Sequence, residues 1–70
     1  MISDQQLKTK TDILANKLKA GLFDEVVIEA KNLLIKRKHQ VVYNILSIAY
    51  QSLNEFALSV EIMEEALQKN

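Results

Sequence analysis

One apolar pattern occurs twice in this chain at a fixed interval, and it constrains the fold more than any other feature. The first copy is Phe23, Val26, Val27, Ala30, Leu33 and Leu34, and the second is Phe56, Ser59, Val60, Met63, Ala66 and Leu67. The interval from Phe23 to Phe56 is the same for every pair. Gly21 and Asn54, two residue types that adopt a left-handed backbone readily, come just before the two copies. A fixed period in this range is typical of a helical repeat, in which one helix–turn–helix unit is written more than once.

The scarcity of proline and glycine predicts long helices. The 70 residues contain no proline and one glycine, so few positions interrupt a helix. We expect four helices, from Ser3 or Asp4 to about residue 20, and over about 23–37, 40–53 and 55–69. The short connections between them make neighbouring helices antiparallel. The predicted fold is a single all-α domain over residues 1–70, with two helix–turn–helix hairpins at about 7–39 and 40–70.

The third of these segments is the least amphipathic. Val42, Leu46, Ala49 and Leu53 form one apolar stripe, and Ile45 and Ile48 form another. A helix that is apolar on most sides is buried by several neighbours. We therefore expect this helix at the centre of the domain.

Charge and cysteine content exclude several classes of protein. Nine basic and nine acidic side chains cancel, so no overall field attracts nucleic acid or an anionic membrane. Cysteine is absent, which rules out disulfides and thiolate metal sites and is compatible with a reducing compartment. Apolar runs are too short to cross a membrane, and residues 1–4 do not resemble a signal peptide. We expect a cytoplasmic protein with no membrane association.

The sequence contains no recognisable catalytic site. His39 is the only histidine, and it follows the basic run 36–38 without a carboxylate nearby in sequence. A general base or a metal ligand needs such partners. We interpret the basic run as compensation of a helix C-terminus rather than as a phosphate site. The prediction is a protein that is not an enzyme, with no catalytic residue, no cofactor and no metal site.

The second unit resembles a tetratricopeptide repeat, a helical hairpin with a period of about 34 residues. The resemblance is carried by residues 42–50 (VYNILSIAY), 53–56 (LNEF) and 64–67 (EEAL). Ser47, Ser59 and Ala66 match the small positions at which the two helices of such a hairpin cross closely. The first unit is degenerate, because Leu14, Val26 and Leu33 stand at those positions. The resemblance implies a segment of an α-solenoid over about residues 7–70.

The same resemblance implies a function in protein–protein interaction or assembly. Members of this family bind peptides or helices on the concave face that their first helices line. In this sequence that face would be Val41, Asn44, Ile45, Ile48, Gln51 and Ser52. The partner would be a protein or peptide whose identity the sequence does not give.

A second candidate surface comes from an asymmetry between the two units. Leu58 and Ile62 form an apolar pair on the side of their helix opposite the stripe of Phe56, Val60 and Leu67, whereas Glu25 and Glu29 stand at the equivalent places. An apolar pair there suggests a covered surface. The cover would be a third repeat or a second copy of this chain, so Leu58 and Ile62 are predicted to mediate self-association or contact with a next repeat.

Two alternatives stay open. The chain can instead be a non-catalytic N-terminal scaffold segment of a larger enzyme, such as a transferase. It is also similar to pentatricopeptide repeats, which read single-stranded RNA. Ile45 and Gln40 stand at the matching base-reading positions, and an isoleucine cannot read a base edge. With no net charge in addition, nucleic-acid binding is not expected.

Overall fold

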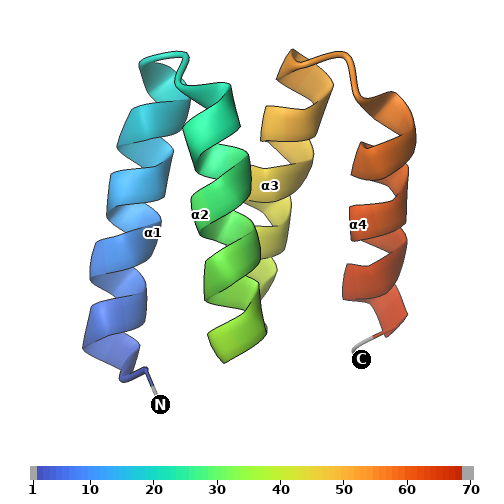
Figure 1. The fold of residues 1–70 in the computed structure, drawn as a ribbon. Helices are drawn as coiled ribbons and strands as arrows, with labels where there is room; N and C mark the ends of the chain where they lie inside the picture. The colour runs from blue at the N-terminus through green and yellow to red at the C-terminus, as the bar shows by residue number, and fades with distance from the viewer. Residues whose placement is uncertain (1, 69–70) are drawn as a thin grey trace.

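The computed structural model describes residues 2–68, and all regular structure in this part of the chain is helical (Figure 1). The helices are α1 (Asp4–Lys19), α2 (Phe23–Lys36), α3 (Gln40–Ser52) and α4 (Phe56–Gln68). Their bounds agree with the expected segments to within one residue, and the expected end at Lys69 lies outside the described residues. The prediction of an all-α fold with four helices is confirmed.

Local sequence explains where these helices begin and end. The Ser3 hydroxyl accepts a hydrogen bond from the Gln6 backbone at 3.1 Å, and the Gln6 side chain accepts one from the Ser3 backbone at 3.0 Å. This reciprocal pair is a capping box at the start of α1. Gly21 and Asn54 have φ angles of 82° and 62°, so both repeated turn residues adopt the left-handed backbone that ends a helix.

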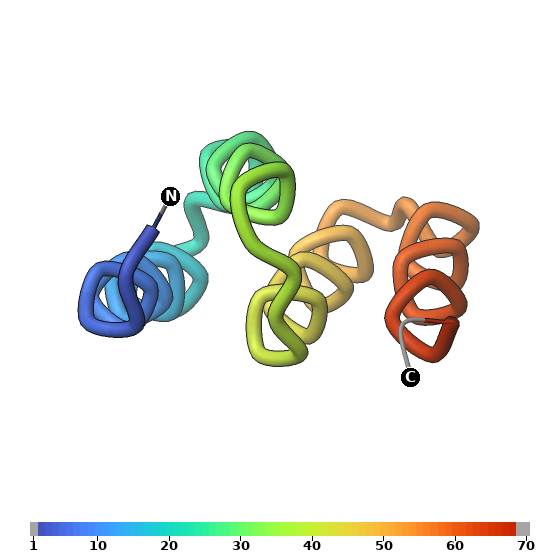
Figure 2. Tube along the Cα trace, turned by 90° about the horizontal axis from the view of Figure 1, so that it is seen from below, coloured from blue at the N-terminus to red at the C-terminus, as the bar shows by residue number. Residues whose placement is uncertain are grey.

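The helices stand side by side, and α3 lies in the middle of the row. Seen along the helices in Figure 2, α1 and α2 lie on one side of α3 and α4 lies on the other. α3 contacts all three other helices, whereas α4 contacts α3 alone. The expectation that residues 40–53 form a central helix is therefore confirmed. None of the helices is both long enough and apolar enough to cross a membrane, as far as residues 2–68 show.

The core is built mainly by α1, α2 and α3. Its largest fully buried side chains are Leu14, Val26, Val42 and Leu46, which come from these three helices. α4 contributes only two buried residues, Ser59 and Ala66, and one half-buried side chain, Ile62. The last helix is thus attached to the core along one narrow side.

Candidate interaction surface

The crossing of α3 and α4 is close because its side chains are small. Ser47, Ser59 and Ala66 are all buried, and the two serine hydroxyls lie 2.7 Å apart in a hydrogen bond. Gln51 on the same side of α3 donates to the Ser59 hydroxyl at 3.2 Å. The α3 and α4 backbones approach each other over more of their length than those of α1 and α2, where Leu14 and Val26 stand at the corresponding positions. The prediction of small residues at this crossing is confirmed.

A second polar contact joins α3 and α4. The Tyr43 hydroxyl donates a hydrogen bond to Glu65 Oε2 at 2.9 Å. Burial, and in addition the contact with this carboxylate, raise the pKa of the Tyr43 phenol above its usual value. Together with the serine pair, this bond determines which side of α4 faces α3.

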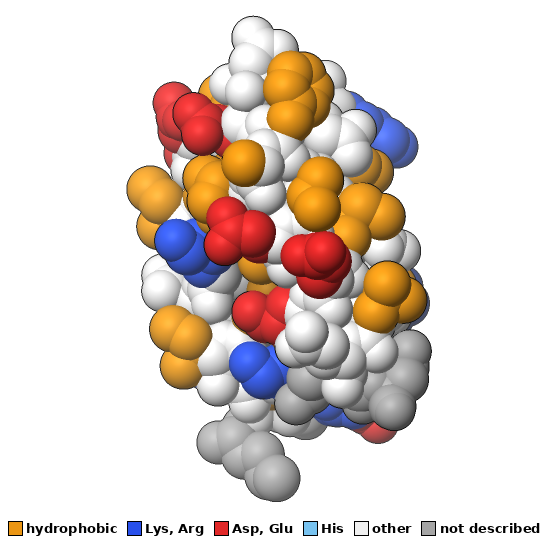
Figure 3. Space-filling view, turned by 90° about the vertical axis from the view of Figure 1, so that its right-hand side faces the viewer, with side chains coloured by type: hydrophobic (Ala, Val, Ile, Leu, Met, Phe, Trp, Pro, Cys, Tyr) orange, Lys and Arg blue, Asp and Glu red, His pale blue; other side chains and the backbone are white. Residues whose placement is uncertain are grey.

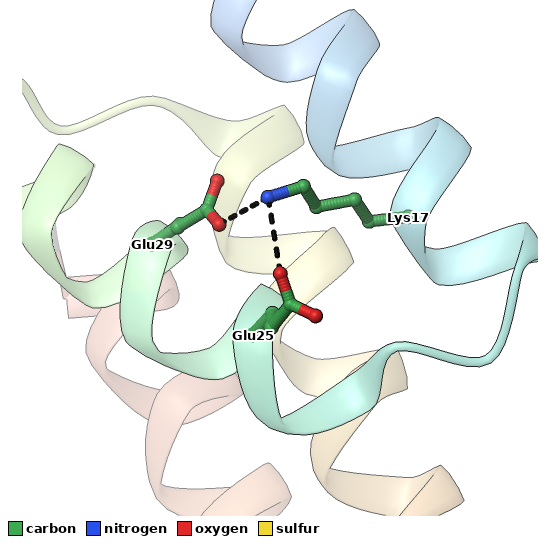
Figure 4. A network of polar contacts seen from close by, with 3 residues as sticks. All are labelled: Lys17, Glu25 and Glu29. Atoms are coloured by element: carbon green, nitrogen blue, oxygen red, sulfur yellow. Dashed lines mark hydrogen bonds and ion pairs between the residues drawn. The ribbon is translucent and has the colours of Figure 1, made fainter.

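The first hairpin is joined by a different polar contact. Lys17 of α1 reaches across to α2, where its Nζ lies 3.4 Å from Glu25 Oε1 and also pairs with Glu29 (Figure 4). The hydrogen bond to Glu29 is the main cause of a raised pKa of Lys17. Lys17 stands at the position of the first unit that corresponds to Tyr50, a buried aromatic residue of the second. A charged bridge between helices thus takes the place that an aromatic side chain fills in the second unit.

The repeated apolar pattern has opposite environments in its two copies. We define the α2 stripe as Phe23, Val27, Ala30 and Leu34, and the α4 stripe as Phe56, Val60, Met63 and Leu67. Ala30 and Leu34 are buried, with exposed fractions of 0% and 6%, while their equivalents Met63 and Leu67 are 51% and 72% exposed. Phe23 and Val27 are half-buried, while Phe56 and Val60 are 60% and 55% exposed. The α4 stripe is therefore an apolar surface without a cover among residues 2–68.

The arrangement of helices explains this difference. α2 contacts both α1 and α3, so it has one more neighbouring helix than α4 to bury its side chains. Among residues 2–68, α4 has α3 as its only neighbouring helix and meets it with the side that carries Ser59 and Ala66. The repeated apolar pattern is therefore buried in α2 but largely exposed along the α4 stripe. The small residues at 59 and 66 were the sequence signal that marks the side of α4 facing α3.

Leu58 and Ile62 do not form the exposed apolar pair that the sequence suggested. Ile62 is half-buried and packs against the core, and Leu58 lies at the rim with 38% of its surface exposed. α4 is rotated relative to the expected orientation, because its close crossing with α3 brings the side with Ile62 inward. The more exposed apolar surface lies on the α4 stripe instead.

The predicted concave face is placed on α3, but only part of it is accessible. Ile45 is 7% exposed and belongs to the core. Val41 and Ile48 are exposed apolar side chains, at 45% and 46%. The exposed polar members Asn44, Gln51 and Ser52 make hydrogen bonds within the domain, to Gln40, to Ser59 and to the Ile48 carbonyl oxygen. The apolar surface on offer here is smaller than on α4.

The other groups singled out in the sequence have local roles. His39 precedes α3 and caps it, because its Nδ1 accepts a hydrogen bond from the Val41 backbone at 3.2 Å. Arg37 pairs with Asp4, which ties the end of α2 to the start of α1. Within residues 2–68 no group of histidine, aspartate and glutamate side chains is arranged to hold a metal ion.

Comparison of this chain with protein-family models, with curated proteins and with solved structures gives no match. The geometry of the described residues is therefore the basis for a functional interpretation.

Proposed function

We propose that this protein is a helical-repeat interaction module, similar in plan to two tetratricopeptide hairpins, and that its open edge at α4 binds a helix or peptide of another protein. The observation that carries the proposal is the α4 stripe, four apolar side chains along one helix that are each more than half exposed. Contiguous apolar surface of this kind marks interaction sites on small proteins. No catalytic role is part of the proposal.

The α4 stripe fits the recognition of a helix better than the recognition of an extended strand. Its residues repeat at intervals of three and four, which places them in one row along α4. An amphipathic helix laid along such a row contacts all four side chains at once. Full burial of a side chain of this size stabilises by about 1.5–3 kcal/mol, so four of them can outweigh the cost of ordering a peptide.

The α3 surface takes a supporting part in this proposal. α3 contacts α1 as well as α2. A helix that packs on α4 in the same way would therefore also lie near the exposed side of α3. Ile48 and Asn44 are exposed, while Ala15 and Thr11, at the corresponding positions of α1, are half-buried. The open edge therefore includes the α4 stripe and the Ile48 side of α3. The same edge would serve if the chain is a non-catalytic scaffold segment of a larger enzyme.

RNA reading is not proposed. Ile45, at one of the two matching base-reading positions, lies in the core. The whole of α3 lacks a basic side chain with which to hold a phosphate backbone.

The experiment compares a stripe variant, Val60→Gln/Leu67→Gln, with a control variant, Ile28→Gln/Ile35→Gln. The control removes two isoleucines of α2 that are 62% and 81% exposed and lie outside both stripes. We expect both variants to keep the helical circular dichroism of the wild type. Proteins captured from an extract of the source cells should be lost with the stripe variant and retained with the control. Equal capture by the two variants would contradict the proposal.

A further inference from the structure

The packing of α3 against α2 indicates what kind of helix would fit on the α4 stripe. α3 contacts both α2 and α1, and its side chains Val42, Leu46 and Ala49, at intervals of four and three, are fully buried. The α4 stripe repeats the α2 stripe with side chains of similar kind, and Met63 replaces Ala30. A helix with an apolar row like that of α3 therefore matches the α4 stripe in spacing.

Every charged side chain in residues 40–68 is acidic. Residues 1–39 contain eight basic and five acidic side chains, whereas residues 40–68 contain four glutamates and no lysine or arginine. Glu65 accepts the bond from Tyr43, while Glu61 and Glu64 have no ion-pair partner among residues 2–68. Figure 3 looks onto the α4 end of the molecule and shows a central group of acidic side chains with hydrophobic side chains around it and Lys or Arg side chains at its left and lower edges. At about 100° per residue, Glu64 lies directly beside the stripe, on the side away from Ser59 and Ala66.

A second copy of this chain does not supply a matching helix. The outer side of α1 is polar, with Thr9, Asp12 and Asn16 exposed around Ile13. The apolar row of α3 is already buried inside its own molecule. Two α4 helices packed antiparallel would place the Glu64 flank of one copy beside the Glu64 flank of the other, which is unfavourable.

We propose that the α4 stripe docks a basic amphipathic helix of another protein, in the place that α3 takes on α2. Its apolar row packs on the stripe, and its lysine or arginine side chains face Glu64, with Glu61 farther round the same side of α4. This inference rests on the proposed function and adds the chemistry of the partner. It assigns the acidic charges of α4 to partner recognition.

The probes are two synthetic peptides based on residues 39–53 (HQVVYNILSIAYQSL). One carries Tyr43→Lys and Tyr50→Lys, and the matched peptide carries Tyr43→Glu and Tyr50→Glu. At about 100° per residue these positions lie between the apolar row of α3 and Ser47, which faces α4. On a helix docked on α4 in the same way, the equivalent positions come on the side of Glu64. Fluorescence anisotropy of the labelled peptides measures binding to the full chain at low and at high salt.

We expect the lysine peptide to bind at least about fivefold more tightly than the glutamate peptide at low salt. This difference should shrink at high salt, because salt screens exposed charges, and it should shrink again in the Glu61→Gln/Glu64→Gln variant. The stripe variant Val60→Gln/Leu67→Gln should bind neither peptide, and the control variant Ile28→Gln/Ile35→Gln should bind as the wild type does.

Four results would overturn the inference. Equal affinity for the two peptides would remove the basic partner, and binding that survives in the stripe variant would move the site elsewhere. A dimer seen by sedimentation in the wild type, but not in the stripe variant, would make a second copy the occupant. If neither peptide binds while the stripe variant still loses its captured proteins, the inference fails and the proposed function stands.

Discussion

The helices α2 and α4 carry the same apolar pattern, but α2 has two neighbouring helices and α4 has one. In α2, which contacts α1 and α3, the stripe residues are buried or half-buried. In α4 the side with Ser59 and Ala66 meets α3 and the stripe meets nothing among residues 2–68. The same pattern therefore forms core in one place and surface in the other. An apolar stripe therefore shows which side of a helix can pack against another element, and the number of neighbouring helices decides whether that side is buried.

The two hairpins also differ in how their helices are joined. Small buried residues and a serine pair link α3 to α4, whereas large apolar side chains and the Lys17 bridge link α1 to α2. In both hairpins the polar groups between the helices have hydrogen-bond partners. The second hairpin achieves this with a closer approach of the two backbones.

The largest expected effect is the contrast between the equivalent leucines of α2 and α4. Leu34→Ala should lower the free energy of unfolding by about 2–5 kcal/mol, because it opens a cavity in the core. Leu67→Ala should change it by less than about 0.5 kcal/mol, because that side chain is 72% exposed. Urea denaturation followed by circular dichroism measures both. Equal losses in the two variants would mean that the α4 stripe is covered in solution.

A medium effect is expected at the crossing of α3 and α4. Ser59→Leu should lower the free energy of unfolding by about 1–3 kcal/mol, because a large side chain forces the two backbones apart. It also leaves the buried Ser47 hydroxyl without its partner at 2.7 Å. Ser52→Leu, at an exposed serine of α3, is the control and should be close to neutral. A Ser59 variant as stable as this control would show that the close approach is not needed.

The smallest effect is a change of stability with pH. The folded state raises the pKa of Tyr43 and that of Lys17, so the stabilisation from both groups is complete below pH about 10. It is lost as the pH rises through the folded pKa values. Tyr43→Phe should remove the tyrosine part, so the stability difference between wild type and variant should narrow from pH 8 to above pH 10. Thermal unfolding at the two pH values measures this, and an unchanged difference would contradict the role of the Tyr43–Glu65 bond.

Most of the fold could be predicted from local sequence. The absence of proline, the left-handed positions at Gly21 and Asn54, and the cap at Ser3 give the four helices to within one residue. These signals act within a few residues along the chain, so no tertiary information is needed to read them. The central place of α3 also follows from its own composition, because a helix apolar on most sides requires several neighbours.

The orientation of α4 was not predicted in the same way. Its helical wheel has two apolar sides, one with the stripe and one with Leu58 and Ile62, and hydrophobicity alone ranks the stripe as the inner side. The structure buries Ser59 and Ala66 instead, since a close crossing depends on small size and on hydrogen bonding more than on apolar area. For this reason we place the proposed interaction surface on the α4 stripe rather than on Leu58 and Ile62.

The helices, their ends, the repeated apolar pattern and the small positions of the α3–α4 crossing can all be read from the amino-acid sequence. These properties depend on backbone preference and on side-chain size, which are local. Which copy of the repeated stripe is core and which is surface depends instead on how the helices pack together. Burial is a relation between two elements, and no element among residues 2–68 covers the α4 stripe.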